Sequence, residues 1–179
     1  MVLKYHEARD LIMDTSTTPA PIIRANDEGD RRWFYGGGVQ TWKAHPHETN
    51  GAFHFLEFTS PAGKVTPLHT HPDSDESYYV LEGEIVMHID GVDHRVSQGG
   101  FAMAPRGVPH AFMTTSEVRL LCWHTPGADD GFYLAASRPL DELAEDDRVV
   151  DFDIVRAAAQ KHPDIEIIGP PPFTVPTSA

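Results

Sequence analysis

Apolar and polar residues alternate with a period of two through the middle of the chain, as half-buried β-strands require. The alternating runs are short and are separated by Gly, Pro, Asn and Asp, which favour turns. Asp90-Gly91 is the sharpest hairpin signal, since glycine adopts a positive φ at little cost. No long helical pattern interrupts the runs, so the sequence predicts an all-β sandwich or jelly roll. The expected strands span residues 33–35, 39–43, 52–59, 64–71, 76–82, 84–90, 92–97, 101–104, 110–115 and 117–124.

The pattern changes towards the C-terminus. Residues 140–143 predict one or two helical turns, and residues 152–162 predict a helix that begins near Asp151 or Asp153. Gly-Pro-Pro-Pro at 169–172 cannot continue a helix or a central strand, so we expect an extended tail. With 179 residues the chain is long enough for one domain with a core. We expect an N-terminal arm (1–35), a barrel (36–135), and C-terminal helices with a tail that pack on it (136–179).

The chain is strongly acidic, with 14 Lys and Arg against 27 Asp and Glu and a formal charge of -13. Such a surface repels phosphate backbones and anionic lipids, which argues against nucleic-acid and membrane partners. Anionic substrates meet the same long-range repulsion, although Arg106 or Lys64 could offset it within a cleft. The charge therefore favours neutral or apolar small molecules.

A cytoplasmic location is the expectation, because the single cysteine cannot form an internal disulfide and no signal-like N-terminal segment is present. No stretch reaches the ~20 apolar residues of a membrane span. We also expect a homodimer, since exposed barrel edges need covering and the arm carries apolar pieces at 11–13 and 22–23.

Four residues form a candidate metal site. His69 and His71 are two residues apart, so on a strand both imidazoles point to the same face. The turn formers at 72–75 would bring Glu76 back beside them, and His110 follows a second tight turn. Three imidazoles and one carboxylate suit a single divalent Fe, Mn, Ni, Co, Cu or Zn ion, without choosing among them. One such ion held by four protein groups keeps open positions for water, dioxygen or substrate.

Other histidines have more ordinary explanations. His45 and His47 repeat the His-x-His spacing, but no carboxylate follows at the same distance, which favours a solvated loop. Hydrogen-bonded wall positions are expected for His54, His88, His94 and His124.

Aromatic and apolar residues could build a dry substrate pocket around the ion. Tyr78 shares the strand parity of Glu76 and should face the cavity. The alternative for each residue is that it simply fills the core. The pocket candidates are Phe53, Phe55, Tyr78, Met103, Phe112 and Trp123.

The spacings of glycines and ligands resemble the two cupin motifs, and together they are specific. In the first, five residues separate Gly63 from His69, and His71, Glu76 and Gly83 follow at the family's distances. In the second, Gly99 precedes Pro105, Arg106, Gly107 and His110, with Thr114 where the family usually has Asn. Fifteen residues lie between the motifs, as in small bacterial cupins, and no internal repeat suggests a second module.

Most of the chain looks like the bacterial quercetinase-like flavonol dioxygenases. The resemblance implies a cupin jelly-roll β-barrel and a metal-dependent dioxygenase for a flavonol-like or other hydroxylated apolar substrate. It also implies that Glu76 accepts the proton of the substrate hydroxyl, as ligand and general base. Two alternatives stay open: a metal-dependent isomerase or decarboxylase of a small oxygenated acid, and a non-catalytic small-molecule-binding cupin.

Overall fold

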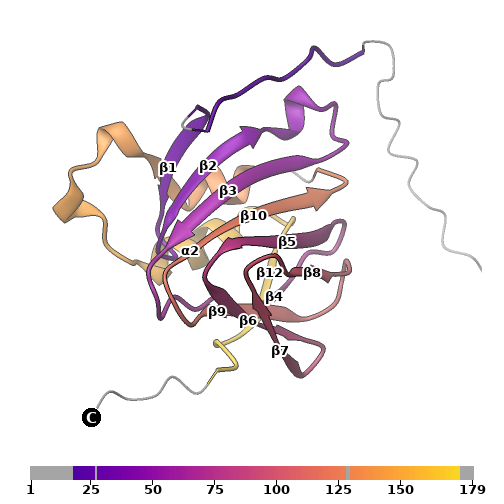
Figure 1. Ribbon diagram of the computed structural model, residues 1–179, viewed down its shortest axis with the longest axis vertical. Coiled ribbons are helices and arrows are strands. Elements are labelled where there is room, and N and C mark those ends of the chain that lie inside the picture. The colour runs from indigo at the N-terminus through magenta and orange to yellow at the C-terminus, as the bar shows by residue number, and fades with distance from the viewer. Residues whose placement is uncertain (1–17, 27, 128–129, 174–179) are drawn as a thin grey trace, which may run out of the picture.

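The structure is a computed structural model that describes residues 18–26, 28–127 and 130–173. Two antiparallel sheets form the body of the protein (Figure 1). The larger sheet has the order β11 (Ser137–Pro139), β1 (Asp30–Phe34), β2 (Val39–Ala44), β3 (His54–Ser60), β10 (Val118–Thr125), β5 (Asp75–Glu82), β8 (Phe101–Ala104). The smaller sheet has the order β12 (Glu166–Gly169), β4 (Leu68–Thr70), β9 (His110–Thr114), β6 (Glu84–Ile89), β7 (Val92–Ser97).

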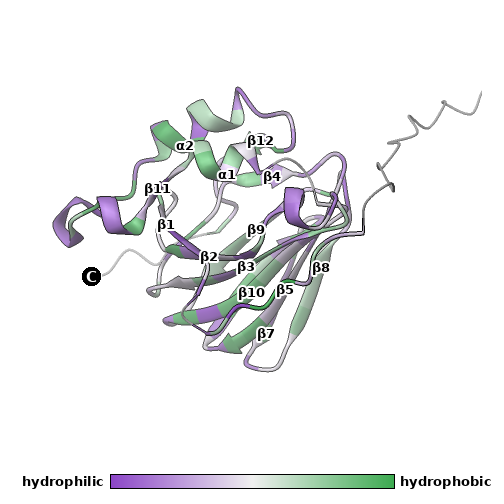
Figure 2. Ribbon diagram, turned by 90° about the horizontal axis from the view of Figure 1, so that it is seen from above, coloured by the Kyte–Doolittle hydropathy of each residue, from purple (hydrophilic) through white to green (hydrophobic). Residues whose placement is uncertain are grey.

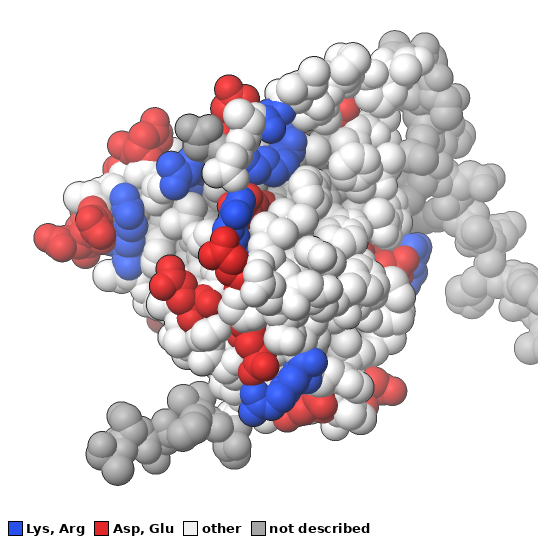
Figure 3. Space-filling model, viewed as in Figure 1, with Lys and Arg blue, Asp and Glu red and all other residues white. Residues whose placement is uncertain are grey.

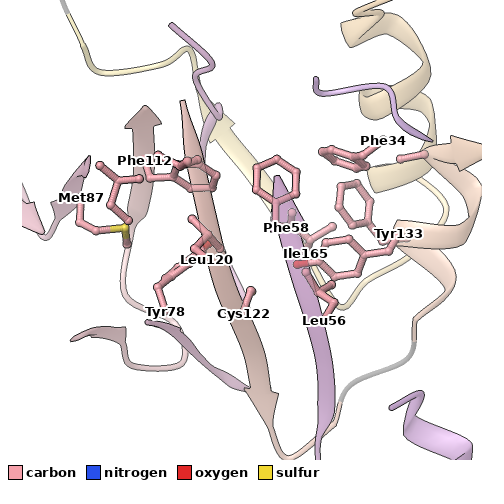
Figure 4. Packing of buried hydrophobic residues seen from close by; sticks show 14 of the residues in the cluster. Phe34, Leu56, Phe58, Tyr78, Met87, Phe112, Leu120, Cys122, Tyr133 and Ile165 are labelled. Atoms are coloured by element: carbon pink, nitrogen blue, oxygen red, sulfur yellow. The ribbon is translucent and has the colours of Figure 1, made fainter. Parts of the chain in front are cut away.

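The core lies between the two sheets. Buried and partly exposed residues alternate strictly along β10, as the period-two pattern predicts. Phe58 of the larger sheet and Phe112 of the smaller one meet edge to face, with ring centroids 6.2 Å apart (Figure 4). The predicted hairpin is present between β6 and β7, where Asp90 and Gly91 both have positive φ, as a primed turn requires. The all-β jelly-roll prediction is confirmed.

Two short helices and one sheet edge gather at one end of the barrel. Figure 2 shows α1 (Gly131–Ala135), α2 (Phe152–Ala159) and β12 beside β4. The Asp151 side chain accepts hydrogen bonds from the backbone N–H groups of Asp153 and Ile154 and so caps α2, close to the predicted helix start. Single 3-10 turns span Pro46–Glu48, Leu140–Glu142 and Glu145–Asp147.

Several predicted boundaries differ from the structure. The strand expected at 64–71 is regular only in β4, because the backbone before it makes isolated bonds to β9. The helix expected at 152–162 ends at Ala159. Strands β11 and β12 were not predicted, and β12 ends at Gly169, where the expected extended tail begins.

The N-terminal arm is described only from residue 18, so the apolar piece at 11–13 lies outside the described residues. β1, which falls within the expected arm, pairs with β2 and β11 and is part of the larger sheet. No helix among the described residues has the length and apolarity needed to cross a membrane. On the face shown in Figure 3, basic side chains lie mostly beside acidic ones rather than forming a continuous patch.

Candidate metal centre and cavity

Four side chains from neighbouring strands meet inside the barrel. His69 lies on β4, Glu76 on β5 and His110 at the start of β9, while His71 directly follows β4. β4 and β9 pair at His69 and His110, whose ring centroids are 4.3 Å apart. All four side chains are buried. The structure thus brings together the residues that the spacing singled out.

A backbone carbonyl holds each of the three imidazoles. A carbonyl oxygen only accepts hydrogen bonds, so each Nδ1 carries a proton and each Nε2 is directed towards the centre. These hydrogen bonds fix the tautomer and the orientation of each ring, as outer hydrogen bonds do in metal sites generally. The Nδ1 atoms of His69, His71 and His110 lie 2.8, 2.9 and 2.8 Å from the carbonyl oxygens of Pro67, Asp164 and Val108, respectively.

The spacing of the inner atoms fits a shared ion. The Nε2 atoms of His110, His71 and His69 lie 2.8, 3.4 and 3.8 Å from Oε2 of Glu76. Two ligand atoms bound at right angles to one ion, each about 2.1 Å from it, are about 3.0 Å apart. The Nε2 of His71 is buried and has no hydrogen-bond partner among the described residues, which is costly unless a ligand binds there. This donor set suits a divalent transition metal ion.

The electrostatics of the centre favour a cation. Burial disfavours the charged form of Glu76, yet the surrounding histidines keep the pKa of its carboxyl group well below the ordinary value. Burial lowers the pKa of His69 to about 4, so this imidazole is neutral and free to bind a metal at neutral pH. For His110, burial is outweighed by the hydrogen bond to Glu76, and its pKa is raised.

The second carboxylate oxygen of Glu76, Oε1, contacts side chains that are not among the four candidate ligands. Its Oε1 lies 3.1 Å from Nε2 of His124 and accepts a hydrogen bond from Sγ of Cys122 at 3.4 Å. The His124 ring also contacts the Ser74 hydroxyl and the Tyr133 hydroxyl, both at 3.1 Å. His124 was expected at a hydrogen-bonded wall position, whereas Cys122 and Tyr133 were not predicted as neighbours of the carboxylate. The parity of 122 and 124 on the buried face of β10 is the signal that could have indicated Cys122.

An apolar cavity of about 70 Å³ adjoins this centre. His69 and Glu76 belong to both, and Tyr78 and Phe112 form part of the cavity wall, as the sequence suggested. A cavity of about 150 Å³ is known to hold benzene, so a ring-bearing ligand enters here only if lining side chains move.

Four of the residues expected in the pocket do not line this cavity. Side chains alternate between the two faces of a strand. On β10, Cys122 lines the cavity, so Trp123 faces away and packs against Phe55, with ring centroids 6.2 Å apart. Met103 is 45% exposed and Phe53 39% exposed. The residues thus corrected are Phe53, Phe55, Met103 and Trp123.

The C-terminal segment closes the cavity and takes part in the centre. Tyr133 of α1, Val155 of α2 and Ile167 of β12 all line the cavity. The carbonyl oxygen of Asp164, just before β12, accepts the Nδ1–H of His71. Sequence analysis expected this segment to pack on the barrel but gave it no role at the centre.

The other His-x-His pair has a different environment. His45 stacks on Trp42 with ring centroids 4.6 Å apart, and its Nδ1 lies 2.8 Å from the carboxylate of Asp130. Only 13% of the His45 side chain is exposed, which corrects the expectation of a solvated loop for this residue. His47 is exposed and lies beside it, with ring centroids 5.5 Å apart.

Comparison with known proteins identifies the class. The family described as Cupin domain matches residues 56–124. A quercetin 2,3-dioxygenase from Bacillus subtilis is 29% identical over 122 residues, which cover 68% of this chain and 36% of that protein. An uncharacterised protein from Methanocaldococcus jannaschii is 34% identical over 85 residues, or 46% of this chain and 68% of that protein. The chain belongs to the cupin superfamily and has a single cupin module.

A solved structure, KdgF from Halomonas sp., has a TM-score of 0.54 at 23% identity, covering 63% of this chain and 98% of that one. At this identity the likeness shows the fold alone. This chain spans only about a third of the length of the Bacillus dioxygenase, so that protein's activity is not carried over with the family.

Proposed function

We propose that the protein is a metal-dependent dioxygenase that acts on a hydroxylated, largely apolar small molecule. One observation carries the proposal: His69 and Glu76 belong both to the metal centre and to the wall of the apolar cavity. A molecule in the cavity therefore touches the centre directly. The similarity to a quercetin 2,3-dioxygenase over 68% of the chain supports the reaction class.

His69, His71, Glu76 and His110 would hold the ion, through three Nε2 atoms and one carboxylate oxygen. When bound, a divalent transition metal ion supplies a Lewis acid that lowers the pKa of a substrate hydroxyl and an electron-transfer partner for dioxygen.

Glu76 accepts the proton of the substrate hydroxyl, because its carboxylate lies in the cavity wall and stays ionised at neutral pH. His124 and Cys122 keep Oε1 in place, so that the carboxylate is presented in one orientation. The apolar side chains around the cavity keep bulk water away from the reacting atoms.

The cavity volume limits the size of the substrate that can bind. A flavonol has several rings, and the space of about 70 Å³ is too small for it unless the aromatic side chains or the covering α2 move. Smaller hydroxylated compounds are therefore expected to bind with less rearrangement.

Oxygen consumption tests the proposal. Protein loaded separately with each candidate ion is supplied with flavonols and with smaller hydroxylated compounds while dioxygen is followed with an electrode. Glu76→Gln should retain most of its metal and lose about a hundredfold or more of its turnover. Glu82→Gln on the same strand is the matched control, because this side chain is 67% exposed, and it should behave as wild type. Undiminished turnover in Glu76→Gln would exclude the base role.

A second candidate is a metal-dependent isomerase or decarboxylase of a small oxygenated acid. The small cavity volume and the presence of Lys64 in its wall favour this alternative. Such a reaction turns over without consuming dioxygen, which the same electrode measurement detects. A binding module without catalysis is the third possibility, and it predicts ligand binding with no turnover under any condition.

Two expectations from the sequence stay predictions. The homodimer is tested by sedimentation at micromolar concentration, where a monomer contradicts it. The cytoplasmic location is tested by cell fractionation.

A further inference from the structure

Lys64 is a buried cation in the wall of the cavity. Its side chain is almost fully buried, and its Nζ donates a hydrogen bond to the carbonyl oxygen of Gly36 at 2.7 Å. The same ammonium lies 5.3 to 5.5 Å from the ring centres of Phe34, Phe58 and Phe112, within cation–π range. In the view of Figure 4, the ring of Phe58 lies between those of Phe112 and Phe34.

Lys64 forms no ion pair with a carboxylate of the described residues, and burial alone lowers its pKa, to about 7. Arg106, the other cation that could offset the negative field in a cleft, is exposed and already bound to Asp75 at 3.0 Å. A buried charge without a counter-ion is energetically costly. The hydrogen bond from Lys64 to the Gly36 carbonyl does not by itself require a charged amine. An anionic group of a ligand in the cavity would give the Lys64 ammonium a counter-ion.

The ammonium lies away from the metal centre along the barrel. The ammonium lies against Phe58, which is level with Leu120 and Val80 across the larger sheet. Val80 is four residues along β5 from Glu76. Four residues of strand correspond to about 13 Å of backbone. A ligand that touches both the centre and Lys64 therefore has to be elongated, and the side chains that line the small cavity have to move to admit it.

We infer that Lys64 is a specificity-determining residue that binds a carboxylate of the substrate at the end of the cavity away from the metal centre. The inference rests on the proposed function in taking this cavity as the substrate site, and it narrows the substrate to a hydroxylated, largely apolar carboxylic acid. The carboxylate of the acid supplies a counter-ion for the Lys64 ammonium, and the three rings then enclose the ion pair.

Binding of butyrate and of its neutral counterpart butyramide tests the inference. The protein carries lysine labelled with ¹³C at Cε, and the Lys64 resonance is assigned as the one absent from Lys64→Arg. Butyrate should raise the titration midpoint of Lys64, and butyramide should leave it unchanged. A carboxylate bound only at the metal centre would not move this midpoint, and an unmoved midpoint overturns the inference.

Variants give an independent measurement by calorimetry. Lys64→Met should weaken butyrate binding by about tenfold or more and leave butyramide binding unchanged. Lys161→Met, which removes an exposed lysine, is the control and should bind both as wild type. Lys64→Gln provides a second neutral side chain, and circular dichroism verifies the fold of each variant. Butyrate binding of wild-type strength in folded Lys64→Met and Lys64→Gln overturns the inference.

The proposed function can fail separately. Absence of dioxygen uptake together with a butyrate-dependent shift at Lys64 removes the dioxygenase and leaves the carboxylate site. Dioxygen uptake with neutral substrates only, together with an unshifted titration midpoint of Lys64, removes the carboxylate site and leaves the dioxygenase.

Discussion

Two His-x-His pairs in this chain have the same spacing and opposite environments. His69 and His71 lie at a buried strand, with each Nδ1 bound to a backbone carbonyl and each Nε2 directed at Glu76. His45 and His47 lie at a 3-10 turn, where His45 stacks on Trp42 and uses its Nδ1 on Asp130. The second pair also meets a carboxylate, since ligand atoms of His45, His47 and Asp130 lie close enough to share an ion. What distinguishes the first pair is its place at a strand and the burial of every member of its group.

The largest expected difference between the two pairs is in metal content. His71→Ala removes a ligand whose Nε2 has no hydrogen-bond partner among the described residues, so bound metal should fall from about one ion per chain to a small fraction of it. His47→Ala changes an exposed imidazole and should leave metal content unchanged. Elemental analysis of protein purified without added metal measures both. Equal metal in the two variants would contradict the assignment of the centre.

The next largest effect is expected on metal affinity, from a residue that contacts Glu76 but is not a candidate ligand. His124→Ala removes the contact that holds Oε1 of Glu76 while keeping all four ligands. Outer partners of this kind typically contribute about 10- to 100-fold to metal affinity, and a loss of that order is expected. Competition with a fluorescent chelator measures the affinity. An unchanged affinity in a folded variant would show that Glu76 is held without His124.

His69 should also couple the stability of the protein to pH. Burial lowers the pKa of His69 to about 4 from an ordinary value of 6.5, so the unfolded chain binds more protons between these limits. The free energy of unfolding of metal-free protein should therefore fall as the pH decreases from about 6.5 to about 4. Calorimetry across this range should show a weaker pH dependence in His69→Gln than in wild type. His47→Gln is the exposed control, and an equal dependence in all three proteins would contradict the prediction.

The smallest effect is expected at the second pair. Asp130→Asn weakens the partly exposed interaction with His45 and should reduce the free energy of unfolding by about 1 kcal/mol or less. Metal content should not change. Urea unfolding measures the free energy of unfolding, and elemental analysis measures the metal content. A loss of metal in this variant would mean that His45, His47 and Asp130 hold an ion as well.

The candidate site was largely predictable from the sequence, and the cavity around it was not. His69, His71, Glu76 and His110 lie in turns and strands whose local signals are strong. Tyr78 was placed correctly because its parity was counted from Glu76. The same count along β10 excludes Trp123, since Cys122 and His124 occupy the buried face.

The features that the sequence did not predict depend on contacts between segments that are distant in the sequence. Asp164 holds His71 across 93 residues of sequence, through a backbone carbonyl that no side-chain pattern reveals. Strands β11 and β12 are three and four residues long, and they are strands only because β1 and β4 offer unpaired edges.

The sequence by itself determined the all-β class, the cupin motifs and the four residues of the centre, because strand parity and turn chemistry act over a few neighbouring residues. Only the tertiary structure decided which side chains line the cavity, how small that cavity is and that Lys64 lies in it without an ion pair to any described carboxylate. The physical reason is that burial and pairing of charges depend on how sheets and the C-terminal segment pack together, which local sequence does not specify.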